Sequence, residues 1–67
     1  MMTGRGVYKA FTILFPGLMN DTTGWGSIHG CKNTIRIRRA DEHDMIFTYN
    51  KYGDWRLEDA RSFRKGK

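Results

Sequence analysis

The chain has 67 residues, a net charge of +5 and one cysteine, Cys31. This length accommodates one domain, and a lone cysteine excludes the disulfide-stapled secreted class, so we expect a cytoplasmic protein. The apolar run at residues 10–19 is too short to span a bilayer, and no membrane partner is expected. Twelve Lys and Arg against seven Asp and Glu favour a polyanionic partner such as nucleic acid, although small soluble domains often carry this much charge.

The first predicted element is a strand over residues 7–15. Its apolar residues would share one face of an extended chain, and Pro16 and Gly17 would end it, because proline cannot donate to a ladder and glycine favours a turn. The residues of that apolar face are Val7, Phe11, Ile13 and Phe15.

Residues 16–30 are predicted to form a long irregular loop, a feature that is uncommon in compact domains and tends to be functional, mobile or partly helical. Leu18, Met19 and Trp25 indicate that part of this loop packs on the core. Because Met and Trp are also favoured interface anchors, the same residues could instead contact a protein partner. The glycines of the loop are read as turn formers: Gly24, Gly26 and Gly30.

Residues 33–58 alternate apolar and polar side chains, which predicts three consecutive strands. We expect their joints at residues 40–44 and 51–53, the second being a three-residue hairpin loop with Gly53 in the left-handed conformation. The register that keeps apolar residues on one face produces two apolar rows across the strands. These rows are Ile37–Phe47–Leu57 and Ile35–Tyr49–Trp55.

The pattern of the last segment, residues 59–67, leaves helix and strand open. We expect a short helix, because acidic residues begin the segment and basic residues end it, which matches a helix dipole. The expected fold is therefore mainly β, and α+β at most. It is a small antiparallel sheet of about four strands, able to curl toward a barrel, with the short helix at its C-terminus. Since one apolar sheet face must be covered, a homodimer is an alternative way to bury it.

The opposite face of the predicted sheet is mainly polar, with Arg36, Thr48 and Arg56 in one row and Arg38, Ile46 and Glu58 in the next. Antiparallel sheets commonly expose one polar face, so a merely solvated surface is one interpretation. Guanidinium groups also bind phosphate oxygens, and the inward aromatic rings favour contacts with a nucleic-acid backbone over base stacking. The predicted nucleic-acid-binding residues are Arg36, Arg38, Arg56, Arg61, Arg64 and Lys65.

We expect binding without chemistry, hence no enzyme and no catalytic residue, because so short a chain leaves little room for a closed pocket. His29, Cys31 and the acidic residues of 41–44 lack the spacing of a zinc site, and neither a metal nor a cofactor is expected. Nucleic-acid binding is the favoured function. The alternative is a protein-interaction module, an inhibitor or adaptor of a larger protein of the kind that phages and mobile elements encode. It would use the loop 16–30 with Leu18, Met19 and Trp25.

Overall fold

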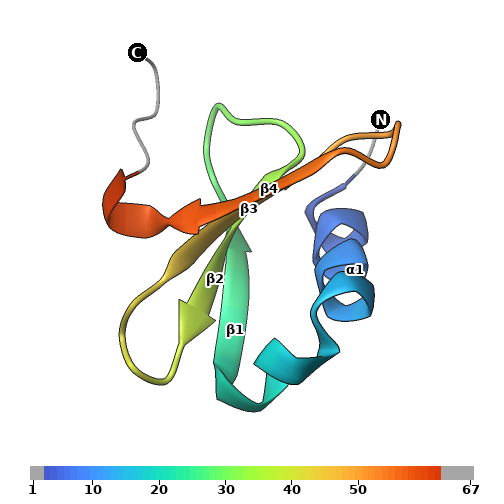
Figure 1. Ribbon diagram of the computed structural model, residues 1–67. Coiled ribbons are helices and arrows are strands. Elements are labelled where there is room, and N and C mark those ends of the chain that lie inside the picture. The colour runs from blue at the N-terminus through green and yellow to red at the C-terminus, as the bar shows by residue number, and fades with distance from the viewer. Residues whose placement is uncertain (1–2, 63–67) are drawn as a thin grey trace.

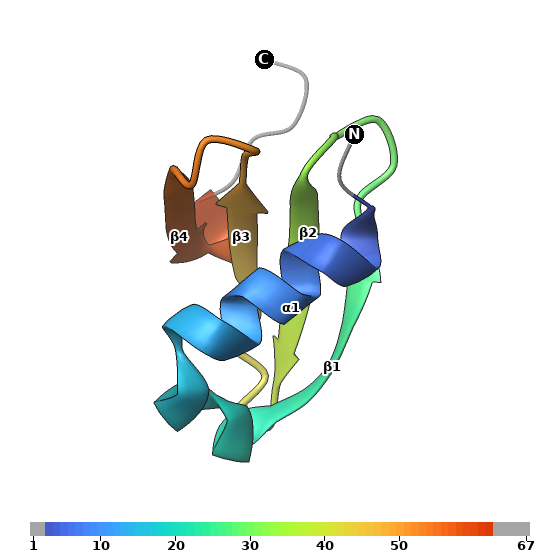
Figure 2. The ribbon, with the colours of Figure 1, turned by 90° about the vertical axis from the view of Figure 1, so that its right-hand side faces the viewer.

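The computed structural model describes residues 3–62 as a four-stranded antiparallel sheet with a helix packed across one face (Figure 2). The elements in chain order are the helix α1 (Gly4–Leu14), the 3-10 helix η1 (Pro16–Asp21), the strands β1 (Thr22–Ser27), β2 (Thr34–Arg39), β3 (Met45–Tyr49) and β4 (Trp55–Asp59), and the 3-10 turn η2 (Ala60–Ser62). The strand order is β1-β2-β3-β4, and β1 and β4 are the two edges (Figure 1). The antiparallel sheet is thus confirmed, but it is open and does not close into a barrel.

The predicted first strand is wrong, because the same residues form α1. Thr3 caps this helix, and its Oγ1 accepts the backbone N–H of Gly6 at 3.1 Å. Val7 and Phe11, four residues apart, are fully buried, whereas Ile13 is 69% exposed. That spacing defines one face of a helix, while a strand would place all three residues on the same side.

Two elements replace the predicted loop over residues 16–30. Pro16 lies in the first turn of η1, where its missing N–H is not needed. Pro16 therefore begins η1 shortly after α1 has ended. The strand β1 then supplies the edge of the sheet. Its Trp25 points toward α1 and stacks on Tyr8, with ring centroids 5.4 Å apart. The expected number of strands is confirmed, but the first of them comes from this segment.

The core lies between α1 and the sheet. Its fully buried side chains are Val7, Phe11, Ile35, Ile37 and Phe47. The rings of Phe11 and Phe47 meet edge-on with centroids 5.4 Å apart, which joins the helix to the centre of the sheet. Burying each of these side chains contributes about 1.5–3 kcal/mol, so the helix is held mainly by packing.

The predicted pairing of the last two strands is confirmed. Phe47 pairs with Leu57, and Tyr49 pairs with Trp55. The loop between these strands contains Gly53 with φ of 90°, the left-handed conformation that the three-residue turn requires.

The pairing of β2 with β3 differs from the predicted register by two residues. Ile35 pairs with Phe47, and Ile37 pairs with Met45. Since side chains alternate with a period of two, a shift of this size changes each residue's partner but keeps it on the same face. The predicted division into an apolar and a polar face therefore holds, whereas the predicted rows hold only between β3 and β4.

The predicted C-terminal helix is wrong within the described residues. The chain continues as β4 to Asp59 and then makes the short turn η2. The carboxylate of Asp59 accepts the backbone N–H of Arg61 at 2.8 Å, a local bond that favours a turn. Among the helices of residues 3–62, none has the length and apolar content needed to cross a membrane.

Candidate nucleic-acid interface

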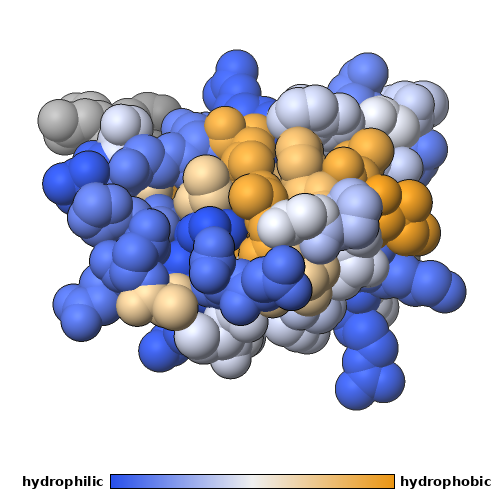
Figure 3. Space-filling model, turned by 60° about the horizontal axis from the view of Figure 1, so that its bottom comes forward, coloured by the Kyte–Doolittle hydropathy of each residue, from blue (hydrophilic) through white to orange (hydrophobic). Residues whose placement is uncertain are grey.

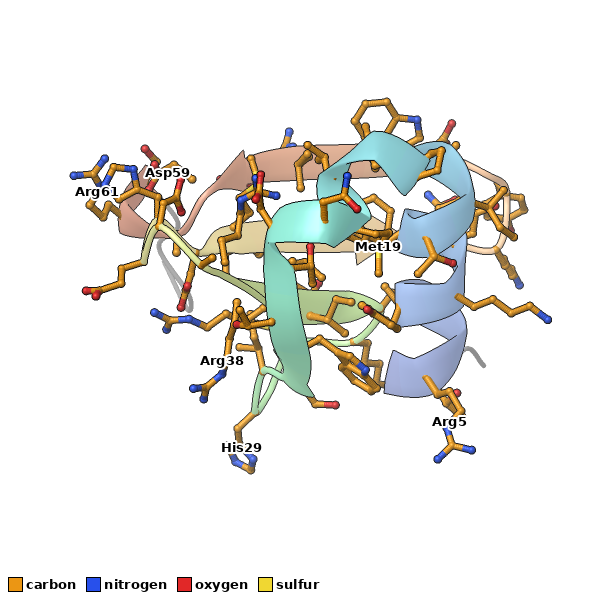
Figure 4. All side chains as sticks on the ribbon, turned by 90° about the horizontal axis from the view of Figure 1, so that it is seen from below. Arg5, Met19, His29, Arg38, Asp59 and Arg61 are labelled. Atoms are coloured by element: carbon orange, nitrogen blue, oxygen red, sulfur yellow. The ribbon has the colours of Figure 1, made fainter. Side chains whose placement is uncertain are left out.

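The candidate site is the face of the sheet that points away from α1, here called the outer face. Because Ile35 and Ile37 are buried under the helix, the alternating Arg36 and Arg38 point the other way. Figure 4 shows Arg38 directed away from α1, whereas Arg5 extends from the helix on the opposite side of the molecule. The strand residues of the outer face are Gly24, Gly26, Thr34, Arg36, Arg38, Ile46, Thr48, Arg56 and Glu58.

Cross-strand pairing arranges these residues in three rows. Pairing places Thr34 beside Thr48, and Thr48 beside Arg56. The hydroxyls of the two threonines lie 3.2 Å apart and share a hydrogen bond. The next row is Gly26–Arg36–Ile46–Glu58, and the last row pairs Gly24 with Arg38. The predicted row of Arg36, Thr48 and Arg56 is therefore wrong for Arg36, which pairs with Ile46, whereas Thr48 does pair with Arg56. Of the four strand arginines, Arg36, Arg38 and Arg56 still share one face.

Arg36 is held by Asp44. The Nε of Arg36 donates to Oδ2 of Asp44 at 2.8 Å, and Oδ1 of the same carboxylate accepts the backbone N–H of Arg39 at 3.3 Å. The hydrogen bond from Arg36 lowers the pKa of Asp44 below its usual range. Arg36 thereby ties the loop after β2 to the sheet.

Arg36 also shields the apolar side chain of Ile46 on the outer face. Ile46 is only 3% exposed, although it lies on the face that α1 does not cover. Its direct cross-strand partners are Arg36 and Glu58, and the aliphatic stems of such side chains shield an apolar neighbour. This arrangement could not be predicted from the sequence, since it depends on the register of β2 with β3.

Arg38 and Arg56 are the available cations of the outer face. Both are exposed, and neither forms an ion pair with a carboxylate of residues 3–62. Arg38 also borders a shallow depression with polar walls, where Thr23, Glu42 and Asp44 are among the lining residues. On this face, which no helix of residues 3–62 covers, the two exposed guanidinium groups can bind an anion from solvent.

The remaining predicted cations are placed differently. Arg61 lies in η2 and forms an ion pair with Asp59, with its Nε 3.3 Å from the carboxylate. Figure 4 shows these two side chains together at the end of β4. Arg64 and Lys65 lie outside the described residues. The structure thus brings Arg36, Arg38 and Arg56 onto one face and leaves Arg61 beside its own acidic neighbour.

Aromatic side chains are absent from the outer face within strand residues 22–59. Trp25, Phe47 and Tyr49 point toward α1, as their contacts with the core indicate. Trp55 is 49% exposed but lies on the helix side, where it meets Phe15 edge-on with centroids 5.0 Å apart. The strand residues of the outer face therefore offer no ring on which a nucleobase could stack, and the exposed Tyr52 lies in the loop between β3 and β4.

Leu18, Met19 and Trp25, the residues of the predicted protein interface, are partly buried and pack against the core. Figure 4 places Met19 between η1 and the sheet. Other large apolar side chains are more exposed, among them Ile13 and Leu14 at the end of α1. Figure 3 shows an apolar area on this side of the molecule within an otherwise hydrophilic surface. The predicted strand over residues 7–15 placed Ile13 on an apolar face, so its exposure on α1 was not expected.

The acidic loop after β2 makes local contacts. Asp41 accepts the backbone N–H of His43 at 3.0 Å, and Asp44 binds Arg36 as described. Within residues 3–62, no three His, Cys, Asp or Glu side chains are grouped as metal ligands would be.

Comparisons of the chain with models of protein families, with curated proteins and with solved structures found no match. The functional assignment therefore rests on the geometry and charge of the outer face.

Proposed function

We propose that the protein binds the phosphate backbone of nucleic acid through the outer face of its sheet. The observation that supports this proposal best is the pair of exposed guanidinium groups on an uncovered face, Arg38 and Arg56, with no carboxylate partner among residues 3–62. Arginine forks match phosphate oxygens geometrically, and the net charge of +5 attracts a polyanion over a longer range.

The positions of the two arginines favour an extended ligand. Arg38 is on β2, and Arg56 is on β4, two strands away and two rows further along. Strand geometry separates their Cα atoms by roughly 15 Å, so a polyanion that contacts both crosses the strands diagonally. Because no aromatic ring faces it, such a ligand is held by its backbone, and little dependence on base sequence is expected.

A binding assay with fluorescent oligonucleotides tests the proposal. The protein is titrated into a single strand of about 20 nucleotides and into its duplex at low salt, with anisotropy as the readout. We expect Arg38→Gln and Arg56→Gln each to weaken binding about tenfold, because each removes a charge-assisted contact with phosphate.

Arg5→Gln is the matched control, since it removes the same charge from an exposed position on α1. Its affinity should stay within about twofold of the unmodified protein. Equal losses in all three variants would mean that total charge, and not the outer face, determines binding. Absence of binding to either oligonucleotide would end the proposal.

A protein-interaction module is the second candidate function. The surface that favours it is not the loop 16–30 but a group of exposed apolar side chains on the helix side. Ile13 is 69% exposed, Leu14 is 41% exposed and Trp55 is 49% exposed, all on the helix side of the sheet. Exposed apolar side chains that lie together mark interaction surfaces. Affinity capture before and after nuclease treatment distinguishes the candidates. A stoichiometric protein that survives nuclease and is lost with Ile13→Ser supports this second function.

A further inference from the structure

We infer that the phosphate backbone lies directly over β1, in contact with the bare main chain at Gly24 and Gly26 and beside Arg38. This inference rests on the proposed function and specifies where on the outer face the ligand lies. The occupant is a phosphodiester chain, because Gly24 pairs with the exposed Arg38, which forms no ion pair with a carboxylate of residues 3–62. Gly26 pairs with Arg36, which Asp44 holds.

The positions of the two glycines come from the inward direction of Trp25. That residue lies between them in β1 and stacks on Tyr8 of α1, so its two neighbours face outward. At Gly24 and Gly26 the outer face of β1 therefore presents main chain alone, next to Arg38 and Arg36, while Thr23 lines the depression that Arg38 borders. The prediction that Gly24 and Gly26 form turns is wrong, and their spacing of two residues around a tryptophan was the signal for a strand.

The fold itself does not require these glycines. Neither has a positive φ, and a Cβ atom added at either would meet nothing within 4 Å. The irregular pairing between Thr22 and Gly24 therefore does not depend on a left-handed residue. By contrast, a Cβ at Gly4 would come within 2.7 Å of Ser27 Oγ, so packing explains that glycine.

Glycine inside a strand destabilises it by about 0.5–1 kcal/mol relative to alanine. Glycine inside a strand often marks a bulge or a close approach by a ligand or another backbone, and Gly26 lies where the pairing with β2 is regular. The neighbouring arginines select an anionic ligand. A ligand that starts over β1 beside Arg38 and continues across the sheet also reaches Arg56, which agrees with the diagonal path.

The inference is tested with Gly24→Ala and Gly26→Ala, each measured for thermal stability and for binding to the single strand and the duplex. The added methyl group meets open space within the protein, so the unfolding temperature should stay the same or rise. The same methyl group stands where the ligand would lie, and affinity should fall by about fivefold, and further with Gly26→Val. Comparing the two oligonucleotides shows which form of phosphate backbone fits the surface.

Gly17→Ala is the matched control, because Gly17 lies in η1 and a Cβ there also meets nothing within 4 Å. It should leave affinity unchanged. If the alanine variants at positions 24 and 26 bind as the unmodified protein does while Arg38→Gln still weakens binding, this inference is overturned and the proposed function stands. A marked loss of thermal stability in either alanine variant would also overturn it, by showing that the fold needs the glycine. Absence of binding by the unmodified protein overturns both.

Discussion

Asp44 connects the loop after β2 to the outer face of the sheet. One of its oxygens accepts from the side chain of Arg36 and the other from the main chain of Arg39. This arrangement separates the arginines of the outer face into two kinds. Arg36 serves the structure, whereas Arg38 and Arg56 form no ion pair with a carboxylate of residues 3–62.

The lowered pKa of Asp44 predicts how its contribution to stability depends on pH. Because the folded pKa lies below the unfolded value, Asp44 stabilises the fold above about pH 4, and this stabilisation disappears as the pH falls through the folded pKa. Asp44→Asn should therefore have a lower Tm than the unmodified protein at pH 7. The difference should shrink in acid, as followed by circular dichroism.

Glu42→Gln is the control for this experiment. Glu42 lies in the same loop and is exposed, so its replacement should change Tm little at any pH. A difference between Asp44→Asn and the unmodified protein that stays constant from neutral to acidic pH would contradict the role of the Asp44 carboxylate.

Among the elements, α1 provides the clearest test of the fold. Phe11 is fully buried against Phe47, while Ile13, two residues later, is 69% exposed. Phe11→Ala should lower the free energy of unfolding by about 3–5 kcal/mol, whereas Ile13→Ala should change it by less than about 0.5 kcal/mol. Denaturant unfolding measures both values. Comparable losses in the two variants would indicate the strand that the sequence pattern predicted.

The sheet was largely predictable, and the helix was not. In residues 33–58 the strict alternation determines which side chains share a face, and the turn at Gly53 determines the pairing of β3 with β4. The loop after β2 lacks such a turn signal. Its geometry depends on the side chain of Asp44, and the predicted register was consequently wrong by two residues.

The failure at α1 has a different physical cause. Two glycines and several β-branched residues give this segment a low helix propensity, and its apolar residues fit a strand pattern as well as a helix pattern. Burial of Val7 and Phe11 against the sheet decides between the two, and that contact is invisible in the local sequence. The error also concealed β1, since the segment after α1 was read as a loop.

These errors had unequal effects on the candidate site. The placement of Arg36, Arg38 and Arg56 on one face follows from alternation alone and was predictable. The difference in availability between Arg36 and Arg38 was not, because it depends on Asp44 reaching across the loop. The outward position of Gly24 and Gly26 was not predicted, because the segment that forms β1 was predicted to be a loop.

On the scale of the whole molecule, the two sides of the sheet differ in character. The outer face carries arginines, glycines and short polar side chains, whereas the helix side buries the core and exposes Ile13 and Leu14. Positive charge is present on both sides, since Arg5 and Lys9 are exposed on α1. The net charge of +5 therefore cannot by itself identify a binding face.

The homodimer stays a prediction, which light scattering at two concentrations tests.

The dependence of binding on salt tests the central claim most directly, because it counts the phosphate contacts that each face makes. The association constant is measured over a series of salt concentrations for two double variants of equal charge, Arg38→Gln/Arg56→Gln on the outer face and Arg5→Gln/Lys9→Gln on α1. The slope of log K against log salt is negative. We predict that the outer-face variant makes it shallower by about 1.4–1.8, the value for two lost phosphate contacts, and that the α1 variant leaves it unchanged. Equal slopes for the two double variants would contradict binding through the outer face.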